Sequence, residues 1–279
     1  MRTFNINVSK YFTAKIKLGE VLHKVTSLDP SILSDAAQKG AVWIQKGGKG
    51  KILKLRSTDA IVDPDDKVNF YYDPRVLSYP ELTNAECVLE TQDYGIWIKP
   101  AGVLPQGTQT GDHTALLRII EKLKKKEVYL IHRLDRETEG LMVVGYTSDA
   151  ASRLSDLFAK NKIIKTYQAI VKGELERGLR KTITDSLDGK EAITHFEVLE
   201  NVNGKSLLEI RIDTGRLHQI RRHLDGIGYP IMGDPKYGKG NKNREGLKLL
   251  AKSLAFKDPW TGQKVEVALG SQLVICSSY

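Results

Sequence analysis

The chain has 279 residues, of which 41% are hydrophobic and 28% are charged, a balance that is typical of folded proteins and excludes a largely disordered chain. Lys and Arg outnumber Asp and Glu by 43 to 34, and the resulting net charge of +9 favours a polyanionic partner such as nucleic acid. No apolar run approaches the roughly 18 residues of a membrane span, and the first residues do not predict a secretory signal.

The two cysteines, Cys87 and Cys276, stand far apart in the sequence. Such a pair does not predict a disulfide framework or a cysteine-based metal site, and it indicates a reducing compartment. We therefore expect a cytoplasmic protein.

Residues 1–76 predict a small basic α/β module. Residues 17–25 and 31–40 have apolar residues at helical spacing, and we expect Ser31 to cap the second helix. Residues 41–45 and 61–72 alternate like short strands, with DPDD as a turn. Residues 77–84, which include a proline, are expected to form a linker.

An acid-free basic stretch runs from residue 36 to residue 58 within this module. Its bases are Lys39, Lys46, Lys49, Lys51, Lys54 and Arg56. Glycines interrupt the run that begins at Lys46, and Trp43 stands just before that run. A basic loop beside an aromatic side chain can hold phosphates and stack on a base, and the alternative is an ordinary solvated hairpin.

Residues 85–279 predict a second domain with longer elements. The expected strands are residues 87–90, 95–99, 141–146, 163–172, 192–199, 206–212 and 265–269, and the expected helices are residues 113–126, 148–160 and 216–224. Strands outnumber helices, and many neighbouring strands lack a helical crossover. This pattern favours an α+β fold with a mixed, largely antiparallel central sheet and flanking helices.

Asp135 lies between Arg133 and Arg136 in a polar loop that leads directly into an apolar strand. Cationic neighbours favour an ionised carboxylate, which can serve as a nucleophile or a base. The alternative is a structural salt bridge, the commoner fate of an Asp flanked by arginines.

The segment TGRLHQIRRHL predicts a helix with Leu217, Ile220 and Leu224 on its apolar face. Arg221 flanks that face, and its planar guanidinium suits bidentate pairing, so we predict a buried partner for a carboxylate. Arg222 lies on the opposite side and is predicted to face solvent or nucleic acid.

Two further side chains admit more than one interpretation. His218 and His223 are five residues apart, a spacing that does not place two metal ligands on one helical face, so we expect no metal site. His218 is instead predicted to fix a backbone group or contact substrate. Tyr167, in the strand-like KTYQAIVKG, is either a core residue or a side chain that stacks on a nucleobase and handles a proton.

Four motifs in this order resemble the RluA-type pseudouridine synthases: IWIKPAGVLPQG, HRLDRETEGL, KTYQAIVKG and TGRLHQIRRHL with GYPIMGDPKYG. They extend from about residue 85 to the C-terminus. Residues 1–76 resemble a divergent α-L RNA-binding motif. The resemblance implies the isomerisation of uridine to pseudouridine in structured RNA, either rRNA or tRNA, by base flipping and without a metal or organic cofactor.

The resemblance also implies roles for single residues. Asp135 would be the catalytic carboxylate, Tyr167 the stacking and proton-handling residue, and Arg221 the pocket arginine that pairs with Asp135. RNA contacts are expected from Arg133, His132, Arg216, His218 and Arg222 in the second domain, and from Lys46, Lys49, Lys51, Lys54 and Trp43 in the first. His132 is also expected to support the loop that carries Asp135.

Glu139 departs from the family pattern, which usually has Ser at this position. We expect altered substrate contacts rather than lost chemistry, because Asp135, Thr138 and Gly140 are present. The alternative is a non-catalytic RNA-binding or ribosome-assembly factor on the same fold. No motif identifies the target RNA, and we expect a monomer.

Overall fold

The computed structural model describes residues 1–270 and 273, and its contacts divide the chain into two compact units. The first unit contains Met1–Asn84 and Gln106–Leu123, and the second contains Ala85–Pro105 and Lys124–Tyr279. The sequence-based division differs, because it assigned all residues after 84 to one domain. Gln106–Leu123 joins the first unit because the Asp112 carboxylate pairs there with Lys54 and Arg56.

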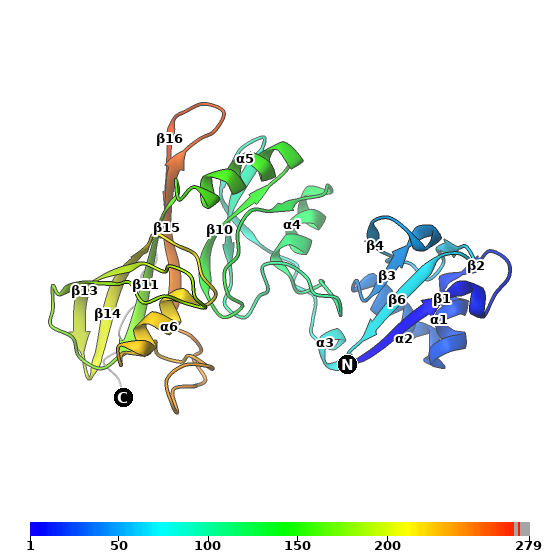
Figure 1. Ribbon diagram of the computed structural model, residues 1–279, viewed down its shortest axis with the longest axis horizontal. Helices are drawn as coiled ribbons and strands as arrows, with labels where there is room; N and C mark the ends of the chain where they lie inside the picture. The colour runs from blue at the N-terminus through cyan, green and yellow to red at the C-terminus, as the bar shows by residue number, and fades with distance from the viewer. Residues whose placement is uncertain (271–272, 274–279) are drawn as a thin grey trace. The chain divides into compact units, whose positions relative to one another are not determined.

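The first unit is built around a four-stranded sheet with the order β1-β6-β3-β4 (Figure 1). The unit as a whole contains the strands β1 (Arg2–Asn7), β2 (Ile16–Lys17), β3 (Val42–Gln45), β4 (Ile52–Lys54), β5 (Ile61–Val62) and β6 (Lys67–Tyr72). Its helices are α1 (Leu18–Thr26), α2 (Pro30–Gln38), α3 (Pro74–Leu77) and α4 (Leu116–Lys124), whose last residue is assigned to the second unit. Apolar residues of α1 and α2 pack with those of β3 and β6 in one core.

Three details of this unit differ from the prediction. Helix α2 begins at Pro30 and is capped by Asp29, whose carboxylate accepts a hydrogen bond from the Ser31 backbone N–H at 2.8 Å. Ser31 is therefore not the cap. Strand β1 was not predicted, and it pairs along its whole length with β6. Residues 61–72 form two separate strands, because β5 pairs with β2 whereas β6 pairs with β1 and β3.

The second unit contains a ten-stranded sheet (Figure 1). Eight of its strands follow the order β12-β13-β14-β11-β15-β10-β8-β7, and the other two, β16 and β9, pair with β15 and β10. Its strands are β7 (Glu86–Glu90), β8 (Tyr94–Lys99), β9 (Tyr129–Leu130), β10 (Glu139–Gly145), β11 (Ile164–Lys172), β12 (Arg180–Ile183), β13 (Thr194–Val202), β14 (Lys205–Ile212), β15 (Leu249–Lys257) and β16 (Lys264–Ala268). Among the described strands, only β10 and β15 pair in parallel. The predicted α+β fold with a mixed, largely antiparallel sheet is confirmed.

Helices α5 (Ser148–Ala159) and α6 (Gln219–Gly226) belong to this unit and correct two further predictions. Helix α5 is capped by Thr147, whose hydroxyl accepts a hydrogen bond from the Ala150 N–H, and not by Ser148. Helix α6 starts three residues later than predicted, so Leu217 lies before it and is 63% exposed instead of buried.

Gly140 is needed where β10 meets β15. Its φ is +124°, and a Cβ atom there would lie 2.3 Å from the backbone oxygen of Ala251. We expect Gly140→Ala to lower the free energy of unfolding by about 3 kcal/mol, because strain and a backbone clash add together. Gly178→Ala is the control, since Gly178 also has a positive φ but open space around it. Its expected loss is about 1 kcal/mol. If the two variants lost the same free energy of unfolding in urea titrations, the clash expected at Gly140 would be contradicted.

Candidate active site

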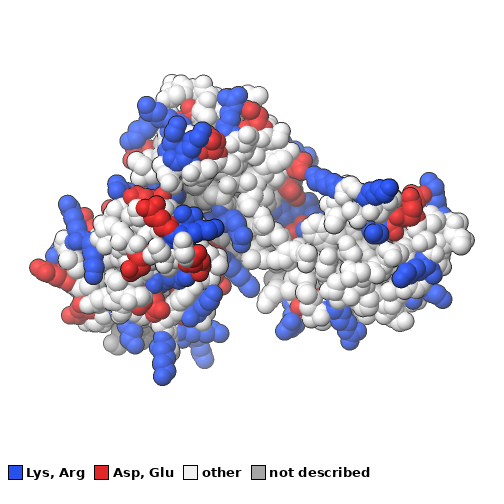
Figure 2. All heavy atoms as spheres, in the orientation of Figure 1, with Lys and Arg blue, Asp and Glu red and all other residues white. Residues whose placement is uncertain are grey.

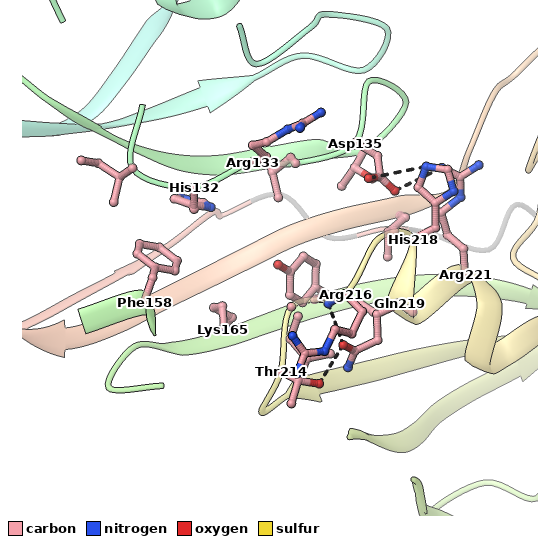
Figure 3. Close-up of a pocket in the computed structure, with 18 of the residues that line it drawn as sticks. His132, Arg133, Asp135, Phe158, Lys165, Thr214, Arg216, His218, Gln219 and Arg221 are labelled. Carbon is pink, nitrogen blue, oxygen red and sulfur yellow. Dashed lines mark hydrogen bonds and ion pairs between the residues drawn. The ribbon is translucent and has the colours of Figure 1, made fainter. Parts of the chain in front are cut away.

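A pocket of about 610 Å³ lies entirely within the second unit (Figure 3). It is lined by the loop before β10, by one face of β11, and by the segment between β14 and α6. Asp135, Tyr167 and Arg221, the three catalytic candidates, all line it. Residues that are 86 positions apart in the sequence, Asp135 and Arg221, are thus brought together.

Asp135 and Arg221 form the predicted ion pair. The Arg221 Nη1 donates to Asp135 Oδ2 at 3.1 Å (Figure 3). The Arg221 side chain is only 2% exposed, whereas the Asp135 side chain keeps 22% of its surface open to the pocket. The arginine is therefore a fixed part of the protein interior, and the carboxylate is the member of the pair that a ligand can reach.

A second carboxylate, Asp234, holds Arg221 from the other side. Arg221 Nε and Nη2 donate to its two oxygens at 2.7 and 2.8 Å, and the Asp234 side chain is fully buried. The backbone N–H groups of Lys236 and Tyr237 donate to the same carboxylate. Burial alone would raise the pKa of Asp234, but Arg221 and these N–H groups keep it below its ordinary value. Asp234 thus fixes the guanidinium that faces Asp135.

Sequence reasoning did not single out Asp234, although it lies in the quoted motif GYPIMGDPKYG. An Asp followed by Pro in a turn is ordinarily a local hydrogen-bond acceptor. Asp234 fills that role toward Lys236 and Tyr237 and also binds Arg221. Only the tertiary contact reveals the second role.

His218 lies beside the other oxygen of the Asp135 carboxylate. Its Nε2 is 3.9 Å from Asp135 Oδ1, and its Nδ1 is 3.0 Å from the Tyr237 hydroxyl. The residue has a left-handed backbone with φ of 53° at the start of α6. Burial lowers the pKa of His218, while Asp135 opposes that shift. His218 thus lies in the pocket next to the carboxylate, and its expected contact with substrate stays a prediction.

Tyr167 is 9% exposed and projects into the pocket from β11. Burial, and after it the negative charge of Asp135, raise the pKa of the Tyr167 hydroxyl. The phenol therefore stays protonated near neutral pH and is a hydrogen-bond donor rather than a phenolate. Its ring offers a flat apolar surface beside the catalytic candidate.

His132 and Arg133 precede Asp135 in the pocket-lining loop and differ in their surroundings. The His132 ring stacks on Phe158 with centroids 4.2 Å apart, and its Nε2 accepts a hydrogen bond from the Val143 N–H. Burial, and after it Lys165, lower the pKa of His132 to about 3, so the ring is neutral. His132 thus supports the loop, and this arrangement speaks against the expected RNA contact. Arg133 is exposed.

Arg216 and Arg222 also have different environments. Arg216 lines the pocket, and its Nε donates to the Glu191 carbonyl at 2.8 Å. Arg222 is not among the lining residues, and its guanidinium forms a bidentate pair with Asp188 at 2.8 and 3.0 Å. Arg222 therefore faces away from the pocket, as its position on the helical projection predicted.

Lys99 is a buried residue that sequence reasoning overlooked in the motif IWIKPAG. Its Nζ donates to three backbone carbonyls, those of Pro100, Val103 and Arg136, at 2.8, 2.8 and 3.0 Å. Burial lowers the pKa of Lys99 to about 8, although nearby carboxylates oppose the shift. The ammonium ties the loop that carries Asp135 to the end of β8.

The acid-free basic stretch of the first unit is partly neutralised in space. Lys54 and Arg56 pair with Asp112 at 2.6 Å, and Lys54 also lies 4.7 Å from the centre of the Trp43 ring. The indole N–H of Trp43 donates to the Gln109 carbonyl at 3.0 Å. These contacts contradict the expectation that Lys54 and Trp43 form an open docking surface, since both bind residues 109–112.

The remaining lysines of the predicted docking set are more accessible. Lys46 pairs with Asp66 at 2.7 Å but is exposed, and Lys49 and Lys51 are exposed. Within residues 1–270 and 273, neither Lys49 nor Lys51 forms an ion pair. Figure 2 shows Lys and Arg side chains projecting from both units, with Asp and Glu among them.

Three absences hold for the described part of the chain. No cluster of three or more His, Cys, Asp or Glu side chains could hold a metal ion there. None of the helices in that part has the length and apolar character needed to cross a bilayer. Cys87 is a free thiol, and Cys276 lies outside the described residues.

Comparison with known proteins places this pocket in a family. The model for the RNA pseudouridylate synthase family matches residues 93–225, which include Asp135, Tyr167 and Arg221. A ribosomal large subunit pseudouridine synthase D from Zymomonas mobilis is 33% identical over 276 residues, which cover 87% of this chain and 86% of that protein. An uncharacterized RNA pseudouridine synthase, YlyB, from Bacillus subtilis is 29% identical and covers 84% of this chain and 80% of its own.

Two further similarities agree. A tRNA pseudouridine synthase C from Vibrio parahaemolyticus is 31% identical over 60% of this chain and 82% of its own. The solved structure of human RNA pseudouridylate synthase domain containing 1 covers 70% of this chain and 86% of its own, with a TM-score of 0.60 and 23% identity, and it supports the fold. With a relative above 30% identity that this chain covers almost entirely, the chain belongs to the RluA-type family of RNA pseudouridine synthases.

Proposed function

We propose that this enzyme isomerises uridine at selected positions of structured RNA with Asp135 as its catalytic carboxylate. The assignment rests on the Asp135–Arg221 pair. Arg221 is buried and binds both Asp135 and Asp234, and the Asp135 carboxylate stays accessible from the pocket. An ionised carboxylate in such a pocket needs a neighbouring cation, because an unpaired buried charge is very costly. Arg221 supplies that cation.

The reaction needs no external reactant. The glycosidic bond between C1′ of the ribose and N1 of uracil breaks, the ring turns, and a bond between C1′ and C5 forms. The proton on C5 is lost to solvent, and N1 gains one, so atoms and electrons balance. Asp135 acts on the ribose while the ring is detached, as a nucleophile or as a base.

The neighbouring residues suit a uridine that has left its helix. The ring of Tyr167 offers a stacking surface, and its protonated hydroxyl can donate a hydrogen bond. Arg133 and Arg216 line the same pocket, and we assign them to phosphates of the flipped nucleotide's strand. His218 assists the orientation of Asp135 from 3.9 Å.

The assignment is tested with RNA that carries tritium at C5 of uridine. Incubation of the full chain with such RNA, prepared from cells that lack this enzyme, is expected to release tritium to water. The rival hypothesis, a non-catalytic RNA-binding or ribosome-assembly factor, predicts binding without release. No release from any rRNA or tRNA fraction would refute the enzymatic proposal.

The target is proposed to be rRNA or tRNA, since relatives that match this chain are named for one or the other. Pseudouridine maps of both RNA classes from a deletion strain and its parent would identify the uridine that loses modification. We further propose a monomeric enzyme in the cytoplasm, where free thiols such as Cys87 remain reduced.

We also propose that the first unit is an RNA-docking module whose free lysines are Lys49 and Lys51. Replacing both with Gln is expected to reduce the slope of log K against log salt concentration by about 1.5, because two phosphate contacts are lost. Lys10→Gln with Lys24→Gln, two exposed lysines of the same unit, is the control and should leave the slope unchanged. If the wild type and both double variants had equal slopes in filter-binding titrations, Lys49 and Lys51 would not contact RNA phosphates.

A further inference from the structure

The pocket continues along β11 beyond Tyr167 to a second cationic side chain, Lys165. Both residues line the pocket, and they are two positions apart on one strand, so they lie on the same face about 7 Å apart along it. Ile212, which lies beside Lys165 in the neighbouring strand β14, lines the same floor. Nothing in the proposed roles of Asp135 and Arg221 uses this end of the pocket.

Lys165 is a buried cation without a partner. The residue is 7% exposed, and its ammonium neither donates a hydrogen bond to a described residue nor forms an ion pair with one. The carboxylate that acts on it from a distance, Asp213, is itself paired with His195 at 2.9 Å. The ring of His132, on the facing loop, is neutral.

Such a residue contributes little to the fold, because an ammonium that is largely removed from water and meets only the open pocket has no ion pair to offset its lost hydration. Burial indeed lowers the pKa of Lys165, and Asp213 offsets this only in part. Apolar neighbours of the same size would serve packing better. A charge kept in a pocket at the expense of stability points to a ligand that carries the opposite charge there.

The order of groups in the pocket indicates which part of the substrate reaches Lys165. Asp135 acts electrostatically on Tyr167, whereas the charges acting on Lys165 are those at its own end. In Figure 3, Lys165 and Phe158 lie away from Asp135 and Arg221. With C1′ of the ribose at Asp135, the ring must extend across Tyr167, and its C4 carbonyl, which is opposite N1, points toward Lys165.

We propose that Lys165 is a further catalytic residue, which donates a hydrogen bond to the C4 oxygen of uracil and stabilises the ring when it leaves the ribose. When the bond between C1′ and N1 breaks, its electron pair stays on N1, and the negative charge spreads over N1 and the two carbonyl oxygens. A fixed ammonium aimed at developing charge stabilises that charge without reorganisation at the moment of reaction. This inference rests on the proposed function of Asp135.

The rival ligand is an RNA phosphate. A phosphate stays with the RNA backbone at the pocket mouth, where Arg133 is exposed, whereas Lys165 is buried in the pocket floor. The two ligands also differ in when the charge exists. A phosphate is already charged when the RNA binds, so a contact between Lys165 and a phosphate would strengthen binding. The uracil ring becomes charged only during the reaction, so a contact with the ring would raise the rate.

Lys165→Met removes the charge and keeps the apolar stem. We expect the single-turnover rate on substrate RNA to fall about 100-fold, while the dissociation constant changes less than about twofold. Lys165→Arg should recover most of the rate, because it restores a cation. The melting temperature of Lys165→Met should equal or exceed that of the wild type, since an unpaired buried charge is gone. Lys172→Met, an exposed lysine on the same strand, is the matched control and should behave as the wild type.

Substrate RNA with 5-fluorouridine at the target separates leaving-group stabilisation from a structural role. Fluorine withdraws electrons and stabilises the detached ring without help from the protein. Because C5 of this substrate carries no proton to lose, the rearranged ring is completed by addition of water across N1 and C6. When Lys165 is replaced by Met, the rate of forming this hydrated, rearranged nucleoside, measured after nuclease digestion, should drop at least 10-fold less than the rate with uridine. Equal losses with both substrates would overturn the proposal.

Three other results would also overturn it. A large rise in the dissociation constant with an unchanged single-turnover rate would assign Lys165 to a phosphate. A lowered melting temperature in both Lys165→Met and Lys165→Arg would make it a structural residue. If the wild type releases tritium and Lys165→Met does so at the same rate, this inference fails alone. If the wild type releases none, the proposed function fails first.

Discussion

Asp135→Asn is expected to abolish pseudouridine formation, with a single-turnover rate at least about 10⁴-fold below that of the wild type. Neutralising a catalytic side chain without changing its shape typically has an effect of this order. Asn keeps an oxygen that can accept the hydrogen bond from Arg221 Nη1, and Arg221 keeps both bonds to Asp234. The fold and the RNA affinity should therefore persist, which thermal melting and filter binding would check.

Glu137→Gln is the matched control for this change. Glu137 lies on the same loop, and its Oε2 is 3.7 Å from the same Arg221 Nη1, but its side chain is 36% exposed and it does not line the pocket. A role in charge balance alone would make the two carboxylates equivalent. We expect less than about a threefold loss of rate, since a partly exposed carboxylate 3.7 Å from the guanidinium contributes little. Comparable losses in both variants would show that Asp135 has no special role.

Asp234→Asn is expected to lower both stability and rate. It replaces one acceptor oxygen with an amide that faces the guanidinium, so a buried bidentate pair is broken. Breaking such a pair typically removes about 3 kcal/mol from the free energy of unfolding. Arg221 then shifts toward Asp135, and misplacing a catalytic carboxylate by about 1 Å reduces rates about 10²- to 10³-fold. Urea unfolding and single-turnover kinetics measure the two effects.

The adjacent arginine on α6 provides the comparison. Arg222 has the same bidentate geometry toward Asp188, but the Asp188 side chain is 67% exposed. Asp188→Asn should lower the free energy of unfolding by less than about 1 kcal/mol and leave the rate unchanged. If Asp234→Asn were equally mild, Asp234 would not be the residue that positions Arg221.

The burial of Arg221 shows how far a helical projection can reach. The periodicity of Ile220 and Leu224 correctly placed Arg221 beside the buried face and Arg222 away from it, because side-chain direction on a helix depends only on local geometry. Leu217 was wrongly included, since the helix begins at Gln219. Helix ends are set by local hydrogen bonds that apolar spacing does not report.

The basic stretch shows the opposite case. Residues 36–58 contain no acid, but Asp112 neutralises Lys54 and Arg56 from more than fifty positions away. Charge counted along the chain says nothing about charge in space, and only the fold decides which lysines stay available. Lys49 and Lys51 remain exposed because they lie in the loop between β3 and β4, away from that carboxylate.

Strand β15 marks the largest gap in the sequence-based fold. Residues 249–257 were not predicted as a strand, although β15 lies between β11 and β10 and forms the parallel pair of the sheet. The sequence of β15, LLAKSLAFK, has no regular alternation of apolar and polar residues that would distinguish a strand from a helix. Most of its residues are buried within the sheet, so both faces of the strand can be apolar.

By itself, the sequence determined the family, the mixed sheet and three members of the site, because motifs and periodicity are local properties of the chain. The tertiary structure alone decided that Asp234 holds Arg221, that His132 is neutral and internal, and that Lys165 is a buried cation with no ion pair among residues 1–270 and 273. These properties depend on desolvation and on contacts between residues that are far apart in the sequence. Both are determined by the folded structure and cannot be derived from the order of the residues.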